Sequence, residues 1–224
     1  MASVKVFGLP ACADVARVLA CMFEKDVEFQ LVRTDNYKVD HKVPEFLKLQ
    51  DPSGQVTYKD EELTLSDSRK ICRRISEKYA KQGEHLLGTG SLERASIEQW
   101  LQAEEHSFDA PSSALVFHLA FAPLMNKRER DQEEIDFNKQ KLSTVLDIYE
   151  DRLGMSKYLA GDDFTLADLS HLPNSHYLVN KTEEGSSLFK SRKNVYRWWN
   201  DISSRVSWKK VVELQSEHPG PLEK

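Results

Sequence analysis

Hydrophobic and polar positions along the first part of the chain change in short runs that predict strands and helices in turn. β-rich runs occur at Val4–Phe7, where turn residues end the run, and at Phe29–Val32. Between them, apolar residues recur at helical spacing and form one stripe: Val15, Val18, Leu19, Met22 and Phe23. The pattern predicts a β-α-β unit, which normally carries a parallel pair of strands joined by a right-handed crossover.

Two short strand candidates and a further helix follow an irregular stretch. The strand candidates are Gln55–Lys59 and Leu63–Leu65, with an acidic turn between them. Apolar spacing predicts the inner face of the helix: Ile71, Cys72, Ile75 and Tyr79. The order β-α-β followed by β-β-α is typical of a thioredoxin-like α/β domain, which we place at residues 1–80.

The rest of the chain is predicted to be helical. Residues 81–91 are rich in glycine and are interpreted as a linker. Long runs with helical periodicity cover Leu92–Ala120 and Glu133–Leu153. We therefore predict a second, all-helical domain over residues 92–224.

The segment Phe164–Leu169 carries the signals of a helix start. Asp168 stands three positions after Thr165, which is the spacing of a capping box that satisfies N–H groups at a helix N-terminus. Phe164 and Leu169 occupy the positions of a hydrophobic staple. We interpret this segment as structural and not catalytic.

Composition and charge limit the classes of protein that fit. The chain has 224 residues, of which 40% are hydrophobic and 30% charged, as in soluble globular proteins. No apolar run approaches the roughly 20 residues that span a bilayer, and the N-terminus lacks the pattern of a signal peptide. The formal net charge is −5 with both signs interspersed, which argues against a nucleic-acid partner. We expect a cytoplasmic protein without a membrane partner.

The cysteines Cys12, Cys21 and Cys72 form no Cys/His spacing typical of a metal site, so we expect no metal. A sparse, odd set is typical of reduced thiols in a reducing compartment. Cys21 and Cys72 fall on apolar helical faces and are predicted to lie in the core.

Several short motifs, each weak alone, occur in a distinctive order and spacing along nearly the whole chain. They are His41-Lys42, Gly54-Gln55-Val56, Asp67-Ser68-Arg69, Tyr158-Leu159-Ala160-Gly161, Phe164–Leu169 and Trp198-Trp199. Together they resemble a plant phi-class glutathione S-transferase. The resemblance implies a cytosolic homodimer that binds glutathione as co-substrate together with a small hydrophobic molecule, and uses no separate cofactor. Enzymes of this class stabilise the glutathione thiolate, which attacks an electrophile.

The resemblance places Cys12 where the family has a catalytic serine at the start of the first helix. The serine hydroxyl donates a hydrogen bond to the glutathione sulfur, and a thiol is a weaker donor. We expect the helix N-terminus to lower the pKa of Cys12. Cys12 is therefore the candidate catalytic residue, for conjugation or for thiol–disulfide exchange with glutathione. A relict position filled by a small residue is the alternative.

The resemblance also assigns the residues that hold glutathione: His41, Lys42, Gln55, Val56, Asp67 and Ser68. The first pair matches residues that reach the glycyl carboxylate, and the second pair matches residues that hold the middle of the peptide. The third pair begins a helix whose N-terminus can hold the γ-glutamyl carboxylate. Without the resemblance, the third pair would be interpreted as ordinary helix caps.

Further positions depart from the family pattern. Asp67 stands where the family has the longer glutamate, and Ser53 replaces a common phenylalanine. Thr57 directly follows Val56, where the family has a cis-proline, and the short spacing to Leu63 favours a deletion. These departures predict a weaker hold on glutathione.

The candidates for the electrophile site are mostly aromatic residues on helical segments: Trp100, His106, Phe108, Phe117, Phe121 and Leu178, with Ala11 at the border. Aromatic residues at helical spacing are also typical of a core. The function indicated is conjugation of glutathione to small hydrophobic electrophiles, in detoxification or secondary metabolism, with weakened or redox-shifted activity. The alternatives are a non-catalytic ligandin that carries flavonoid-like molecules and a thiol oxidoreductase that uses Cys12.

Overall fold

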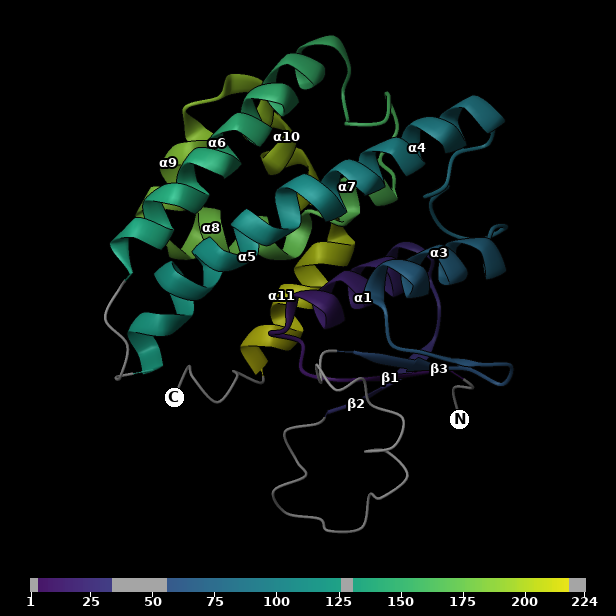
Figure 1. Ribbon diagram of the computed structural model, residues 1–224. Coiled ribbons are helices and arrows are strands. Elements are labelled where there is room, and N and C mark those ends of the chain that lie inside the picture. The colour runs from purple at the N-terminus through teal and green to yellow at the C-terminus, as the bar shows by residue number, and fades with distance from the viewer. Residues whose placement is uncertain (1–3, 34–55, 126–130, 218–224) are drawn as a thin grey trace. The chain divides into compact units, whose positions relative to one another are not determined.

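The structure is a computed structural model, and it describes residues 4–33, 56–125 and 131–217. The described residues form two compact units (Figure 1). One contains residues up to Glu84 together with the segment that begins at Lys210, and the other runs from His85 to Lys209. The domain limits expected from the sequence, with a separate linker at residues 81–91, stay a prediction.

Within the described residues, the first unit is built on a four-stranded mixed sheet in the order β2-β1-β3-β4. The strands are β1 (Val4–Phe7), β2 (Phe29–Val32), β3 (Thr57–Lys59) and β4 (Thr64–Leu65). β1 pairs in parallel with β2, as the β-α-β pattern predicts, and antiparallel with β3, which pairs antiparallel with β4. Val6, at the centre, has Leu31 and Tyr58 as its cross-strand neighbours.

Helices α1 (Ala13–Glu24) and α3 (Ser68–Lys78) pack side by side on one face of this sheet (Figure 1). The predicted apolar stripe of α1 is buried except at Phe23, which is partly exposed beside Phe29. The predicted inner face of α3 is buried up to Ile75, and Tyr79 caps the helix. Burial of these stripes stabilises both helices by about 1.5–3 kcal/mol for each large apolar side chain.

Asp60 shapes the turn between β3 and β4. Its Oδ1 accepts hydrogen bonds from the backbone N–H groups of Glu62 and Leu63, each at 2.9 Å. Its Oδ2 accepts from the Tyr58 hydroxyl at 2.9 Å and from the Lys78 ammonium at 2.8 Å. Burial opposes ionisation, yet these donors together lower the pKa of Asp60 below its usual range. The acidic turn expected from the sequence is therefore a fixed part of the sheet.

The chain leaves the first unit against the end of α1. The Glu84 N–H donates to the Glu24 carbonyl at 3.0 Å, and the Lys25 ammonium donates to the Glu84 carbonyl at 2.7 Å. Gly83 has a φ of +58°, and a Cβ there would lie 2.1 Å from the Glu24 oxygen. Only glycine fits this close approach.

The regular segments that the structure describes in the second unit are all helical. Its elements are α4 (Ser91–Ala103), the π-helical η2 (Glu104–Phe108), α5 (Asp109–Val116), the π-helical η3 (Phe117–Phe121), the 3-10 segment η4 (Ala122–Met125), α6 (Gln132–Met155), α7 (Leu166–Leu169), α8 (Leu172–Lys181), α9 (Glu183–Lys190), α10 (Lys193–Ser203) and the start of α11 (Val206–Glu217). The helix expected over Leu92–Ala120 is thus interrupted by two π-helical turns. No helix in the described ranges is long and apolar enough to cross a membrane.

Asp168 joins three segments of the helical unit. The capping box is confirmed, because Asp168 Oδ2 accepts from the Thr165 N–H at 3.1 Å and from its hydroxyl at 3.2 Å. The other oxygen, Oδ1, accepts from the Trp198 indole N–H at 2.9 Å and from the Leu159 N–H at 3.1 Å. Burial raises the pKa of Asp168 to about 6, although four donors surround the carboxylate. The role is structural, as the sequence predicts.

Candidate functional site

Cys12 lies at the end of a tight turn that leads from β1 into α1. We call residues 9–12 the Cys12 turn; the Cys12 N–H donates to the Leu9 carbonyl at 2.9 Å and closes it. Gly8 precedes the turn with a φ of +144°, a conformation that favours glycine. Cys12 is the N-cap of α1, with extended backbone angles of −74° and 135°, and its thiol makes no capping hydrogen bond. The thiol therefore stands at the helix N-terminus without a capping role.

The pKa of Cys12 shifts in the direction opposite to the one expected from the sequence. The residue is partly buried, and burial followed by the negative charge of Asp14 raises the pKa of its thiol. The prediction of a lowered pKa was wrong, because desolvation and a nearby carboxylate outweigh the helix dipole. At neutral pH, Cys12 is a protonated thiol, which can donate a weak hydrogen bond.

A largely buried polar cluster joins α1 to α3 beside the Cys12 turn. Asp14 Oδ1 accepts from the Arg17 guanidinium at 2.6 Å and from the Ser68 hydroxyl at 2.5 Å. Arg17 also donates to the Ser68 oxygen at 2.7 Å and is only 1% exposed. Ser68, assigned to glutathione, thus gives its single hydroxyl proton to Asp14 and is itself buried. Asp14 and Arg17 were not singled out from the sequence, where only their spacing of three signals a pair.

Asp67 caps α3. Its Oδ1 accepts from the backbone N–H groups of Arg69 at 2.9 Å and Lys70 at 3.0 Å. Its Oδ2 lies 3.3 Å from the Lys70 ammonium, and the side chain is 43% exposed. Burial opposes ionisation, but the backbone and side chain of Lys70 and the N–H of Arg69 together lower the pKa of Asp67. Asp67 is therefore an ionised helix cap with one oxygen near the surface.

The remaining predicted glutathione contacts are only partly within the described residues. Val56 directly precedes β3 and is buried, and the peptide bond that joins it to Thr57 is trans. His41, Lys42 and Gln55 lie outside the described residues, as does Ser53. Their roles stay predictions from the resemblance.

Four of the predicted electrophile residues fall on the two π-helical segments. η2 carries His106 and Phe108, and η3 carries Phe117 and Phe121. π-Helical turns occur frequently at functional sites, because the extra residue in the turn redirects the side chains around it. The two segments are therefore candidates for a ligand-facing part of this unit.

These aromatic side chains differ in what they can offer a ligand. Phe108 is fully buried, with its ring 4.6 Å from that of His171 and 6.2 Å from that of Tyr149, so its burial argues against a role in lining a site. Phe117 and Phe121 are both partly exposed, and the Phe121 ring lies 5.0 Å from the Tyr177 ring.

The structure also describes the other candidates for the electrophile site. Trp100 is partly exposed, with its ring 5.6 Å from that of Tyr149. His106 is exposed and pairs with Gln102 at 3.0 Å. Leu178 is fully buried, and Ala11 is partly exposed in the Cys12 turn. The prediction that Cys21 and Cys72 lie in the core is confirmed, since both are buried.

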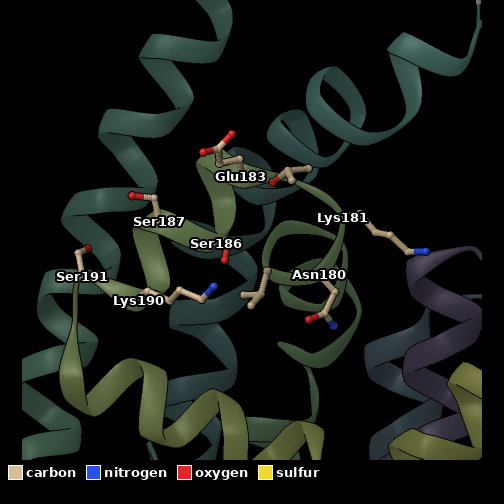
Figure 2. A pocket seen from close by; sticks show the side chains of 9 residues that line it. Asn180, Lys181, Glu183, Ser186, Ser187, Lys190 and Ser191 are labelled. Atoms are coloured by element: carbon tan, nitrogen blue, oxygen red, sulfur yellow. The ribbon is translucent and has the colours of Figure 1, made fainter.

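A cavity of about 650 Å³ opens on the helical unit at the junction of α8 and α9 (Figure 2). It is lined by Val179, Asn180, Lys181, Thr182, Glu183, Ser186, Ser187, Lys190 and Ser191. None of the predicted site residues that the structure describes belongs to this lining. Within the described ranges, no group of three or more His, Cys, Asp or Glu residues could hold a metal ion.

The comparisons with known proteins agree on one family. Residues 113–205 match the C-terminal domain of glutathione S-transferases. Glutathione S-transferase F11 of Arabidopsis thaliana is 44% identical over 94% of this chain and 98% of its own. Glutathione transferase F2 of Populus trichocarpa has a crystal structure with a TM-score of 0.89 and 56% identity, covering 96% of this chain and 99% of its own.

A more distant solved structure carries a ligand. Glutathione S-transferase I from maize, in complex with an atrazine glutathione conjugate, has a TM-score of 0.85 and 30% identity, covering 97% of this chain and all of its own. The fold, with its small mixed sheet and its helical second part, is that of these enzymes. The chain belongs to the glutathione S-transferase family of enzymes, in the plant phi class.

Proposed function

We propose that this protein conjugates glutathione to small hydrophobic electrophiles, and that Cys12 makes this activity weaker than a serine would. The observation that carries the proposal is the place of Cys12: its thiol stands at the N-cap of α1 with no capping hydrogen bond, where burial and then Asp14 raise its pKa. A protonated thiol can donate to the glutathione thiolate, but less strongly than a hydroxyl. Because the helix dipole also favours an anion at this position, the bound thiolate rather than Cys12 would carry the charge.

Glutathione is held, in this proposal, by the residues assigned from the resemblance. Asp67 supports it best among the described residues, because its Oδ2 is near the surface and can accept a hydrogen bond from the γ-glutamyl ammonium. The Ser68 hydroxyl would donate to glutathione only by giving up its hydrogen bond to Asp14, whereas the backbone N–H groups at the start of α3 need no such exchange. The glutathione conjugate bound by the maize relative supports the same substrate class.

A second candidate, thiol transfer, is favoured by the partial exposure of Cys12, since Cys21 and Cys72 are both buried. The Cys12 thiolate would attack the glutathione sulfur of a mixed disulfide, forming a Cys12–glutathione disulfide and releasing the other thiol. A second glutathione thiolate would then attack this bond, giving glutathione disulfide and free Cys12. The raised pKa of Cys12 slows the first step, so we rank this function second.

Calorimetric titration of the protein with glutathione tests both functions. We expect saturable binding with a millimolar or tighter dissociation constant. No binding heat at the highest soluble glutathione concentration would refute both and leave the ligandin alternative. We also propose that the protein is a cytoplasmic homodimer, as the family resemblance implies.

A further inference from the structure

The end of the C-terminal helix contacts the Cys12 turn. Residues from Lys210 onward in α11 belong to the same compact unit as the sheet. Gln215 Nε2 donates a hydrogen bond of 2.8 Å to the carbonyl oxygen of Pro10, although the two residues are 205 positions apart. Gln215 is only 9% exposed, and Pro10 is buried. On the same helix, the Lys210 ammonium lies 5.3 Å from the centre of the Phe23 ring of α1.

This hydrogen bond acts on the backbone next to Cys12. The Pro10 carbonyl belongs to the peptide plane that enters Ala11, and the Cys12 N–H belongs to the plane that leaves it. Gln215 holds the first plane, and the Leu9 carbonyl holds the second at 2.9 Å. Because only the two backbone dihedrals of Ala11 separate the planes, fixing both restricts the approach of the chain to Cys12.

The Pro10 carbonyl also needs a partner for its own sake. A buried backbone carbonyl without a hydrogen bond is costly, and Gln215 supplies a side-chain donor from the last helix. Loss of that donor would favour a rearrangement of the turn that exposes this carbonyl to water. The thiol at the end of the turn would then become more exposed as well.

We propose that Gln215 is a positioning residue for Cys12, through which α11 holds the Cys12 turn and keeps its thiol partly buried. The inference deepens the proposed function, because it matters for activity only if Cys12 takes part in the chemistry. It makes the reactivity of the thiol depend on the docking of the last helix.

The test compares Gln215→Glu and Gln215→Met with the control Glu217→Gln, which changes an exposed residue on the same helix. The first two variants keep the length of the side chain and remove its N–H donor. Alkylation by iodoacetamide, followed by peptide mass spectrometry, measures the three thiols separately in the absence of glutathione. We expect Cys12 in both variants to react about 3–10-fold faster than in the unchanged protein at neutral pH, since a more hydrated thiol has a lower pKa.

Two results would overturn the proposal. One is a Cys12 rate in both variants that stays within twofold of the control. The other is an equal acceleration of Cys12, Cys21 and Cys72, which would show general loosening and a merely structural role for Gln215. A Cys12-specific change without glutathione binding by calorimetry would instead refute the proposed function and leave the positioning role intact.

Hydrogen exchange of the unchanged protein keeps the proposal testable if the variants fail to fold. The Cys12 amide, bonded to the Leu9 carbonyl, should open together with the amides of the second half of α11, with the same dependence on urea concentration. A turn that opens while α11 stays protected would contradict the positioning role.

Discussion

Replacement of Asp168 by asparagine tests how the helical unit is held together. The carboxylate accepts hydrogen bonds from Thr165, Trp198 and Leu159 through two oxygens. Asparagine keeps one oxygen and turns the other into a donor, so the donors on one side lose their acceptor. Each unpaired donor costs about 1–3 kcal/mol, and removal of the buried charge offsets part of the cost of two such donors. We therefore expect the free energy of unfolding to fall by about 2–4 kcal/mol at pH 7.5.

Urea unfolding of the purified protein, followed by circular dichroism, measures this loss. Asp163→Asn is the matched control, since the same substitution at an exposed position nearby should change the free energy of unfolding by less than about 0.5 kcal/mol. A change for Asp168→Asn as small as that of the control would refute the role of Asp168 as the centre of this network.

The pH dependence of the same variant has a definite sign. Burial raises the pKa of Asp168 from 3.8 to about 6 in the folded protein. Its contribution to stability is therefore fully present below pH 3.8 and is lost as pH rises through about 6, by up to about 3 kcal/mol. The asparagine variant should lack this slope, and the difference from the unchanged protein should be larger at pH 4.5 than at pH 7.5. Equal differences at the two pH values would contradict the raised pKa.

Further predictions concern three separate features. Burial and the charge of Lys181 lower the pKa of His176 to about 4, so the contribution of neutral His176 to stability is present above the unfolded pKa of about 6.5 and is lost as pH falls toward 4. Urea unfolding of His176→Asn at about pH 7 and about pH 4.5 should not show this loss of stability, and an unchanged dependence of stability on pH would refute it. Asp14→Asn should speed alkylation of Cys12 by iodoacetamide, because a negative charge that raises the pKa of the thiol is gone, and a slower reaction would contradict this. The same substitution should lower the free energy of unfolding by about 1–3 kcal/mol, because Arg17 loses a charged partner. Light scattering at micromolar concentration should give the mass of a dimer, and the mass of a single chain would refute the homodimer.

The regular elements could be predicted because their signals are local. The run at Val4–Phe7 and the run at Phe29–Val32 form strands with the predicted limits and the predicted parallel pairing. The capping box is confirmed, since both of its residues lie within one turn and need no distant partner. Such features depend on the sequence of a few neighbouring residues and on the hydrophobic period.

The failures come from interactions that the sequence does not place together. The pKa of Cys12 was predicted from the helix dipole alone, and the larger effects of burial and of Asp14 depend on packing. The role of Ser68 depends on Asp14, 54 positions away in sequence, and that of Gln215 on Pro10, 205 positions away. The apolar pattern predicts a continuous helix through both π-helical turns, because one extra residue in a turn only shifts the phase of the pattern.

The substitution Cys12→Ser tests the central claim most directly. The hydroxyl is a stronger donor than the thiol, and a hydrogen bond to a charged group contributes about 1.5–3 kcal/mol. If about half of this is missing with the thiol, conjugation of chlorodinitrobenzene at saturating glutathione should rise about tenfold. The matched control, Cys21→Ser, changes a buried thiol on the same helix and should give no gain. Reduction of glutathione mixed disulfides should disappear with Cys12. A Cys12→Ser protein that conjugates no faster than the unchanged protein would contradict the account.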